Sequence, residues 1–177
     1  RGSLEPLLMN PARRGSLVLG KWGAVASVAM LIATLSCFSF IPAQWLLRSD
    51  TLQAMFQYGW REALAFLVLL LPLSAAMSAL LMAIAIRCRT FKEAQASSTV
   101  ALAIVSLLPL VTVFDQRGES PWHLWVPALA QSTLMTRVLK GEPLGPAELA
   151  VPLAVSTLLT LMALAWMSRR LSDAAVR

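Results

Sequence analysis

The chain has 177 residues, of which 58% are hydrophobic and only 14% are charged. A soluble domain usually carries about a quarter of its residues as charged side chains, so this composition excludes an ordinary soluble protein. The formal net charge of +6 does not require a nucleic-acid partner, because excess Lys and Arg also mark the cytoplasmic side of membrane proteins. Two cysteines and one histidine indicate neither a disulfide framework nor a metal site.

Four stretches are long and apolar enough to cross a membrane, which takes about 20 apolar residues per helix. In chain order they are 22–47, 63–86, 94–114 and 149–168, and none contains an Asp, Glu, Lys, Arg or His side chain. The alternating pattern of transmembrane barrel strands is absent. The predicted fold class is therefore all-α, a polytopic integral membrane protein with four transmembrane helices.

The connecting segments predict the orientation of these helices. Segments 1–21, 87–93 and 169–177 hold ten of the fifteen Lys and Arg residues, whereas 48–62 and 115–148 hold five. Because positively charged segments stay in the cytoplasm, the first three are expected inside and the other two outside. Both ends of the chain are then cytoplasmic, and the membrane is expected to be the bacterial cytoplasmic (inner) membrane.

The second predicted span carries small residues at four-residue spacing. Ala75, Ala79 and Ala83 recur along it, with Ser74 and Ser78 beside them. Small side chains at this spacing allow another helix to approach closely. The stripe predicts a helix contact face, either within the protein or at a dimer seam.

The external segment 115–148 predicts a further helix that is too short to span. Pro127 can start this helix, and Gly141 marks its end. At about twelve residues it cannot cross the bilayer. We expect it to lie in the outer interface or to re-enter the membrane.

Catalytic side chains are not predicted in this chain. An intramembrane hydrolase needs a metal-binding His pair or a His that faces a Ser, and the one histidine, His123, falls in the external segment. We expect it to be a plain interfacial residue between Trp122 and Trp125. A P-loop motif of the GxxxxGK[ST] form is also absent, and the chain is predicted not to be an enzyme.

The first segment, RGSLEPLLMNPARRGSLVLGK (residues 1–21), predicts a short cytoplasmic helix. Ser3 can cap it, and Leu4, Leu7 and Leu8 form an apolar stripe. One interpretation is a basic helix that lies on anionic lipid. The leucine stripe beside an acidic residue fits a helix that enters a protein groove better.

This segment resembles the coupling segment of type-2 ATP-binding-cassette (ABC) exporter permeases, which typically reads E-R-G-[ST]-L-E-x-L-L-x-x-P before a basic residue and G-K. Two later motifs, FKEAQ (91–95) and P-A-L-A-Q…L-x-G-E (127–142), resemble the branch typified by the sodium-efflux permease NatB. The resemblance implies that the chain is the C-terminal part of a six-helix permease, with 1–21 as its cytoplasmic coupling helix.

The resemblance also implies the partners. A separate ABC ATPase subunit would bind ATP and Mg, this chain would hold no cofactor, and a second permease copy or a homologue would complete a dimer in the lipid bilayer. The expected ATPase-contact residues are Glu5, Leu7, Leu8 and Arg13. Sodium is one candidate for the exported substrate. The alternatives are a non-transporting membrane anchor or assembly subunit and, less favoured, an intramembrane hydrolase.

Overall fold

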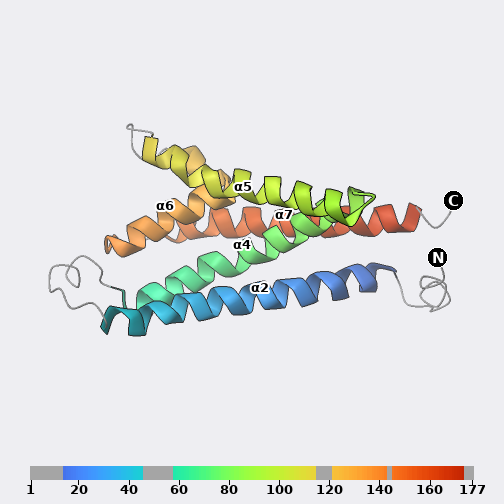
Figure 1. The fold of residues 1–177 in the computed structure, drawn as a ribbon. Coiled ribbons are helices and arrows are strands. Elements are labelled where there is room, and N and C mark those ends of the chain that lie inside the picture. Colours follow the sequence, from blue (N-terminus) through green and yellow to red (C-terminus); the bar gives the residue numbers. More distant parts are fainter. Residues whose placement is uncertain (1–13, 46–57, 115–120, 143–144, 174–177) are drawn as a thin grey trace.

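The computed structural model describes residues 14–45, 58–114, 121–142 and 145–173. Helices account for nearly all of these residues, and no strand occurs in the described ranges. In chain order the elements are α2 (Arg14–Trp45), α4 (Trp60–Arg87), α5 (Phe91–Phe114), the short 3-10 helix η1 (Pro121–Trp125), α6 (Pro127–Leu139) and α7 (Pro146–Asp173) (Figure 1). The prediction of an all-α fold is confirmed.

Four of these helices are long and apolar enough to cross a membrane, as the sequence predicts. The qualifying stretches are Gly15–Ala43, Trp60–Arg87, Phe91–Leu110 and Pro146–Arg170. Each of these stretches begins several residues before the corresponding predicted span, because the helix extends beyond the apolar residues into the polar residues that flank them. Lys and Arg side chains at the ends can run along apolar surface while their charged groups stay in water.

Helix α4 is the centre of the bundle. It packs against α2 and α7 most extensively and also contacts α5 and α6, while α2 and α7 touch each other. The beginning of α2 and the end of α7 lie at one end of the bundle (Figure 1), which we call the terminal end. The end of α2 and the beginning of α4 lie at the opposite end, together with the end of α6, and we call this the cap end.

The small-residue stripe of α4 is a helix contact face, which confirms the prediction. Ala79 has no exposed surface, and Ala75 and Ser78 are also buried. The close approach brings the Trp22 indole of α2 to the backbone of α4, where its Nε1–H donates to the Ala75 carbonyl at 3.1 Å. The Ser78 hydroxyl donates to the Ser74 carbonyl at 2.7 Å, so burial leaves no unpaired hydroxyl there.

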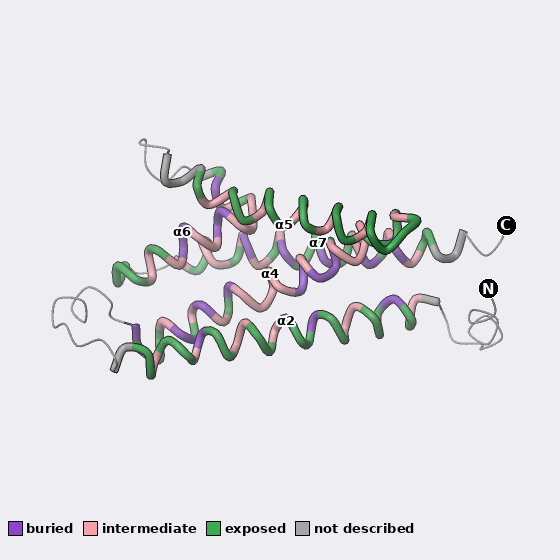
Figure 2. The backbone as a smooth tube through the Cα atoms, viewed as in Figure 1, coloured by how far each residue is buried: buried purple, intermediate pink, exposed green. Residues whose placement is uncertain are grey.

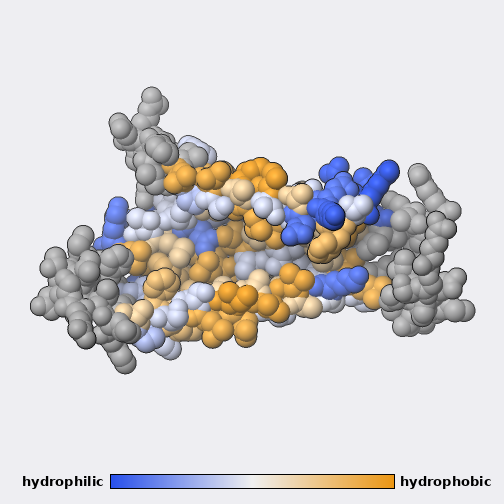
Figure 3. Space-filling view, viewed as in Figure 1, coloured by the Kyte–Doolittle hydropathy of each residue, from blue (hydrophilic) through white to orange (hydrophobic). Residues whose placement is uncertain are grey.

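The outward faces of the long helices are apolar. Exposed side chains include Leu35 on α2, Ile104 and Leu107 on α5, and Leu161 on α7, and orange side chains cover much of the middle of the molecule (Figure 3). Between positions 91 and 110 no residue of α5 is buried, and exposed green dominates its length (Figure 2). A surface of this kind suits the hydrocarbon of a bilayer rather than water.

Candidate functional site

The predicted ATPase-contact residues Glu5, Leu7, Leu8 and Arg13 lie outside the described residues. The structure describes only the last part of their segment, which forms the first turns of α2 from Arg14 onward. Residues 14–21 therefore belong to a helix that is long and apolar enough to cross a membrane.

The first turns of α2 are packed against two other helices. Val18, Leu164 and Met167 form a buried cluster that joins α2 to α7, and α4 contributes to it as well. The partly buried hydrophobic residues packed around these three are Trp22, Met82, Ala83 and Trp166. We call these seven residues the terminal cluster. It makes the start of α2, the end of α4 and the end of α7 one packed unit.

Three helices begin with the same kind of cap, in which a Glu side chain accepts a backbone N–H at the start of its own helix. In α4, Gly59 N–H donates to Glu62 Oε2 at 2.8 Å. In α7, Gly145 N–H donates to Glu148 Oε2 at 2.9 Å. In α5, Arg89 N–H donates to Glu93 Oε2 at 3.0 Å. Each carboxylate occupies the positive end of a helix dipole, which stabilises the helix start.

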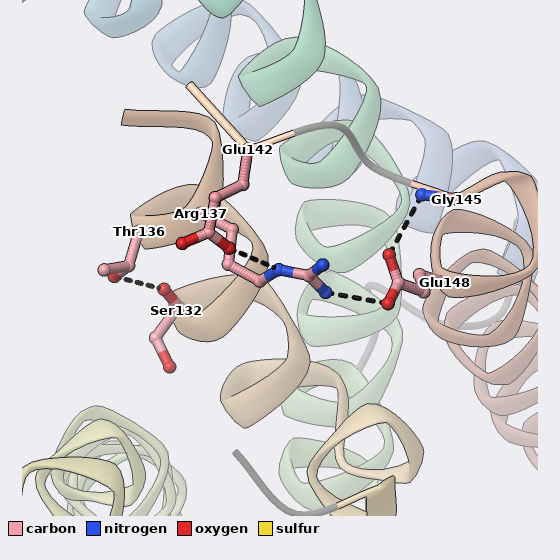
Figure 4. A network of polar contacts seen from close by, with 6 residues as sticks. All are labelled: Ser132, Thr136, Arg137, Glu142, Gly145 and Glu148. Atoms are coloured by element: carbon pink, nitrogen blue, oxygen red, sulfur yellow. Dashed lines mark hydrogen bonds and ion pairs between the residues drawn. The ribbon is translucent and has the colours of Figure 1, made fainter. Parts of the chain in front are cut away.

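A network of polar side chains joins α6 to α7. Arg137 Nε donates to Glu142 Oε2 at 3.1 Å and Arg137 Nη1 donates to Glu148 Oε1 at 2.8 Å (Figure 4). We call Arg137, Glu142 and Glu148 the Arg137 clasp. The guanidinium is about one-fifth exposed, so the two carboxylates neutralise a charge that is largely removed from water.

The end of α6 is shaped to make this clasp. Gly141 has a φ of +72°, a conformation that favours glycine, and Gly141 N–H donates to the Val138 carbonyl at 3.0 Å. Glu142 N–H donates to the Arg137 carbonyl at 3.0 Å, which completes a Schellman ending. The reversal returns the Glu142 side chain to Arg137. Gly141 was predictable from the sequence as the end of this helix, whereas the ion pairs were not.

His123 contradicts the prediction of an interfacial residue. Its ring is only 2% exposed, whereas Trp122 and Trp125 beside it are 50% and 68% exposed. The reason is that η1 packs against α6 and α7 and turns the imidazole inward and the two indoles outward. Among the residues that the structure describes, neither ring nitrogen of His123 has a hydrogen-bond partner, and the same is true of the buried Thr133 hydroxyl of α6.

The chain's one tyrosine ties the end of α2 to the start of α4. Tyr58 is buried, and its hydroxyl donates to the Cys37 carbonyl at 3.0 Å. Its ring meets Phe66 edge-on, with centroids 5.3 Å apart. Burial, followed by the nearby Cys37 and Glu62, raises the pKa of Tyr58 from its ordinary value of 10.0 to about 12.

A buried cluster around Tyr58 also includes α6. Cys37, Tyr58, Ala63 and Phe66 form its centre, and the partly buried residues packed against them are Phe38, Ile41, Leu67, Leu70, Met135 and Val138. The cap end is therefore one packed unit of α2, α4 and α6. Through the clasp it extends to the start of α7.

The described ranges give no support for a metal site or for a disulfide bond. These ranges contain no group of three or more His, Cys, Asp or Glu side chains that could hold a metal ion. Cys37 and Cys88 are both free thiols.

Comparison with known proteins finds no match: no protein-family model, no curated protein and no solved structure corresponds to this chain. A functional assignment therefore depends on the sequence motifs and on the packing described above.

Proposed function

We propose that this chain is the transmembrane permease subunit of an ABC exporter. One observation carries the proposal: the segment that resembles the family's coupling helix continues into α2, and the first turns of α2 are packed against α4 and α7. Val18, four residues beyond the start of α2, is only 2% exposed. A force applied to segment 1–13 would reach the bundle directly.

In this proposal the chain does mechanical work, and a partner ATPase subunit binds ATP and Mg and performs the hydrolysis. Glu5, Leu7, Leu8 and Arg13 contact that subunit. When the ATPase closes, the coupling segment moves, and the terminal cluster passes the movement to α4 and α7. The result is a population shift between two states of the transport path.

The proposed orientation follows the distribution of positive charge. The terminal end of the bundle faces the cytoplasm of a bacterial cell, and the cap end faces outward. Helix α6 is then an external interfacial or re-entrant helix. A second permease copy or a homologue completes the transport path, and the exposed apolar face of α5 is available to it.

The substrate of the proposed exporter is less narrowly defined. Two buried hydroxyls within the long helices bond to their own backbone: Ser78 donates to the Ser74 carbonyl at 2.7 Å, and Thr160 donates to the Ser156 carbonyl at 2.8 Å. No Asp, Glu, Lys, Arg or His side chain occurs in the apolar stretches of the four spans, 22–47, 63–86, 94–114 and 149–168. A hydrophobic or peptide-like substrate therefore fits these helices as well as sodium does.

A membrane anchor or assembly subunit is the second candidate, and the same lack of ionisable residues favours it. An anchor needs no path for a substrate and needs no ATPase. The two candidates differ in whether an ATPase subunit binds the first segment.

Copurification of the full-length protein with ABC ATPase subunits from the same cell tests the proposal. A Leu7→Asp/Leu8→Asp variant should lose the ATPase, because charged side chains cannot enter an apolar groove without a large desolvation penalty. The charge-reversal variant Lys140→Glu, at the opposite end of the bundle, should retain it. Equal recovery with all three proteins, or no ATPase with the wild type, would leave the anchor as the better assignment.

A further inference from the structure

The terminal end of the bundle carries a concentration of exposed positive charge. Six side chains, all exposed, contribute to it: Lys21, Arg87, Arg89, Lys92, Arg169 and Arg170. We call these six residues the basic collar. Hydrophilic blue gathers at the end where α5 begins and α7 ends (Figure 3). Of the carboxylates described at this end, Glu93 caps the start of α5 by accepting the backbone N–H of Arg89.

Cations from three helices flank the terminal cluster in sequence. Lys21 directly precedes Trp22, Arg87 lies one turn beyond Ala83, and Arg170 follows Met167 by three residues. Each is therefore about one helical turn from the same buried cluster. The packing of apolar side chains in the terminal cluster therefore places these three cations at the same end of the bundle.

The collar cations are not neutralised by carboxylates within the part of the chain that the structure describes. Both ion pairs found there belong to the Arg137 clasp at the cap end. Arg170 lies instead over the ring of Trp166, with its guanidinium carbon 5.3 Å from the ring centroid. Like charges that gather at one end of the bundle repel one another, so an anion that binds among them is stabilised.

The apolar side chains at this end indicate what kind of anion fits. Leu19 is 53% exposed and Ile86 is 38% exposed, and both lie within two residues of a collar cation. Phe91, between Arg89 and Lys92, is 83% exposed. A water-soluble acidic partner would leave much of this apolar surface uncovered. A molecule with a charged head and an apolar tail covers both parts.

We propose that the basic collar binds the phosphate groups of anionic phospholipids, whose acyl chains lie along the apolar faces of α2, α4 and α5. Trp22 and Trp166 both pack against the terminal cluster, and indoles favour the boundary between headgroups and acyl chains. Basic groups between transmembrane helices are suited to anionic headgroups in this way. The lipid is predicted to hold the ends of α2, α4 and α7 together by bridging their charges.

Titration of the purified full-length protein with dioleoyl phosphatidylglycerol in nonionic detergent, followed by native mass spectrometry, tests this inference. Dioleoyl phosphatidylcholine serves as the neutral comparison. The wild type should retain phosphatidylglycerol in preference to phosphatidylcholine. Each cation removed is expected to weaken binding about fivefold, so Arg87→Gln/Arg169→Gln should bind phosphatidylglycerol about thirtyfold more weakly.

Matched variants separate the collar from a general effect of charge. Arg61→Gln/Lys140→Gln removes two exposed cations from the cap end and should bind as the wild type does. Arg87→Lys/Arg169→Lys keeps the collar charge and should restore binding, which also shows that loss in the Gln variant does not come from misfolding. Equal weakening by the collar and cap-end Gln variants would overturn the proposal.

Two further outcomes would also overturn it. Displacement of the phosphatidylglycerol by inorganic phosphate would show that the site recognises a free anion rather than a lipid. If Arg87→Gln/Arg169→Gln binds phosphatidylglycerol normally but no longer copurifies with an ATPase subunit, the collar is a protein-binding surface instead.

Discussion

The close contact between α4 and its neighbours can be tested by enlarging one side chain. Ala79 has no exposed surface and lies on the small-residue face of α4, one turn beyond Ala75, whose carbonyl accepts the Trp22 indole at 3.1 Å. The substitution Ala79→Leu adds three carbon atoms where the structure leaves no open surface. Overpacking of a well-packed core typically costs about 1–3 kcal/mol. Full burial of Ala79 places this variant near the upper end, at about 3 kcal/mol.

A matched substitution on the same helix isolates the effect of packing. Ala85 is exposed, so Ala85→Leu makes the same chemical change with no helix to displace, and its effect should be within about 0.5 kcal/mol of zero. The free energy of unfolding is measurable in mixed micelles by titration with sodium dodecyl sulfate, with helix content followed by circular dichroism. Trp22→Phe in the Ala79→Leu background should add little, because the enlarged side chain already separates the indole from its acceptor.

The reasoning is refuted if Ala79→Leu is as stable as the wild type. Leucine gains little by moving from lipid into a helix contact, since lipid is equally apolar. An unchanged stability would therefore mean that α4 has room on this face. Equal destabilisation by Ala79→Leu and Ala85→Leu would mean that the effect does not arise from the helix contact.

Three further substitutions or titrations probe the cap end. His123→Phe should stabilise the protein by about 1–2 kcal/mol, because it replaces a buried imidazole that lacks a hydrogen-bond partner among the described residues. If chemical unfolding shows that the variant is less stable than the wild type, the His123 ring has a polar partner. Titration of tyrosinate absorbance in the 177-residue chain, where Tyr58 is the one tyrosine, should show a midpoint near 12 rather than 10.0. Since the pKa of Tyr58 is higher in the folded than in the unfolded protein, its contribution to the free energy of unfolding is complete below pH 10.0 and is lost as the pH rises toward 12. Tyr58→Phe should abolish this alkaline loss of stability. An unchanged alkaline profile in the variant would contradict the assignment of the loss to Tyr58. Arg137→Gln breaks both ion pairs of the clasp and should lower the unfolding temperature by a few degrees and speed amide exchange at the start of α7, whereas the exposed Lys140→Gln should change neither.

Several features of this protein follow from its sequence alone because they depend on local composition. The number of spanning helices depends on how many apolar stretches exceed the length that a bilayer requires, and the four predicted stretches correspond to α2, α4, α5 and α7. The bounds of α6 follow from Pro127 and Gly141, whose backbone preferences favour a helix start and a helix end. The contact face of α4 was predictable from the spacing of Ala75 and Ala79, since small side chains at helical spacing permit close approach.

The partners of these helices were decided only by the tertiary structure. Nothing local to α4 predicts that it is the central helix, or that Trp22 finds a carbonyl 53 positions away in the chain. The Arg137–Glu148 pair, the contact of Tyr58 with Cys37 and the burial of His123 likewise depend on how separate helices pack. Because lipid is as apolar as the helix surfaces, hydrophobicity alone does not choose among their pairings. Side-chain shape and a few specific hydrogen bonds make that choice, and they act only once the helices have met.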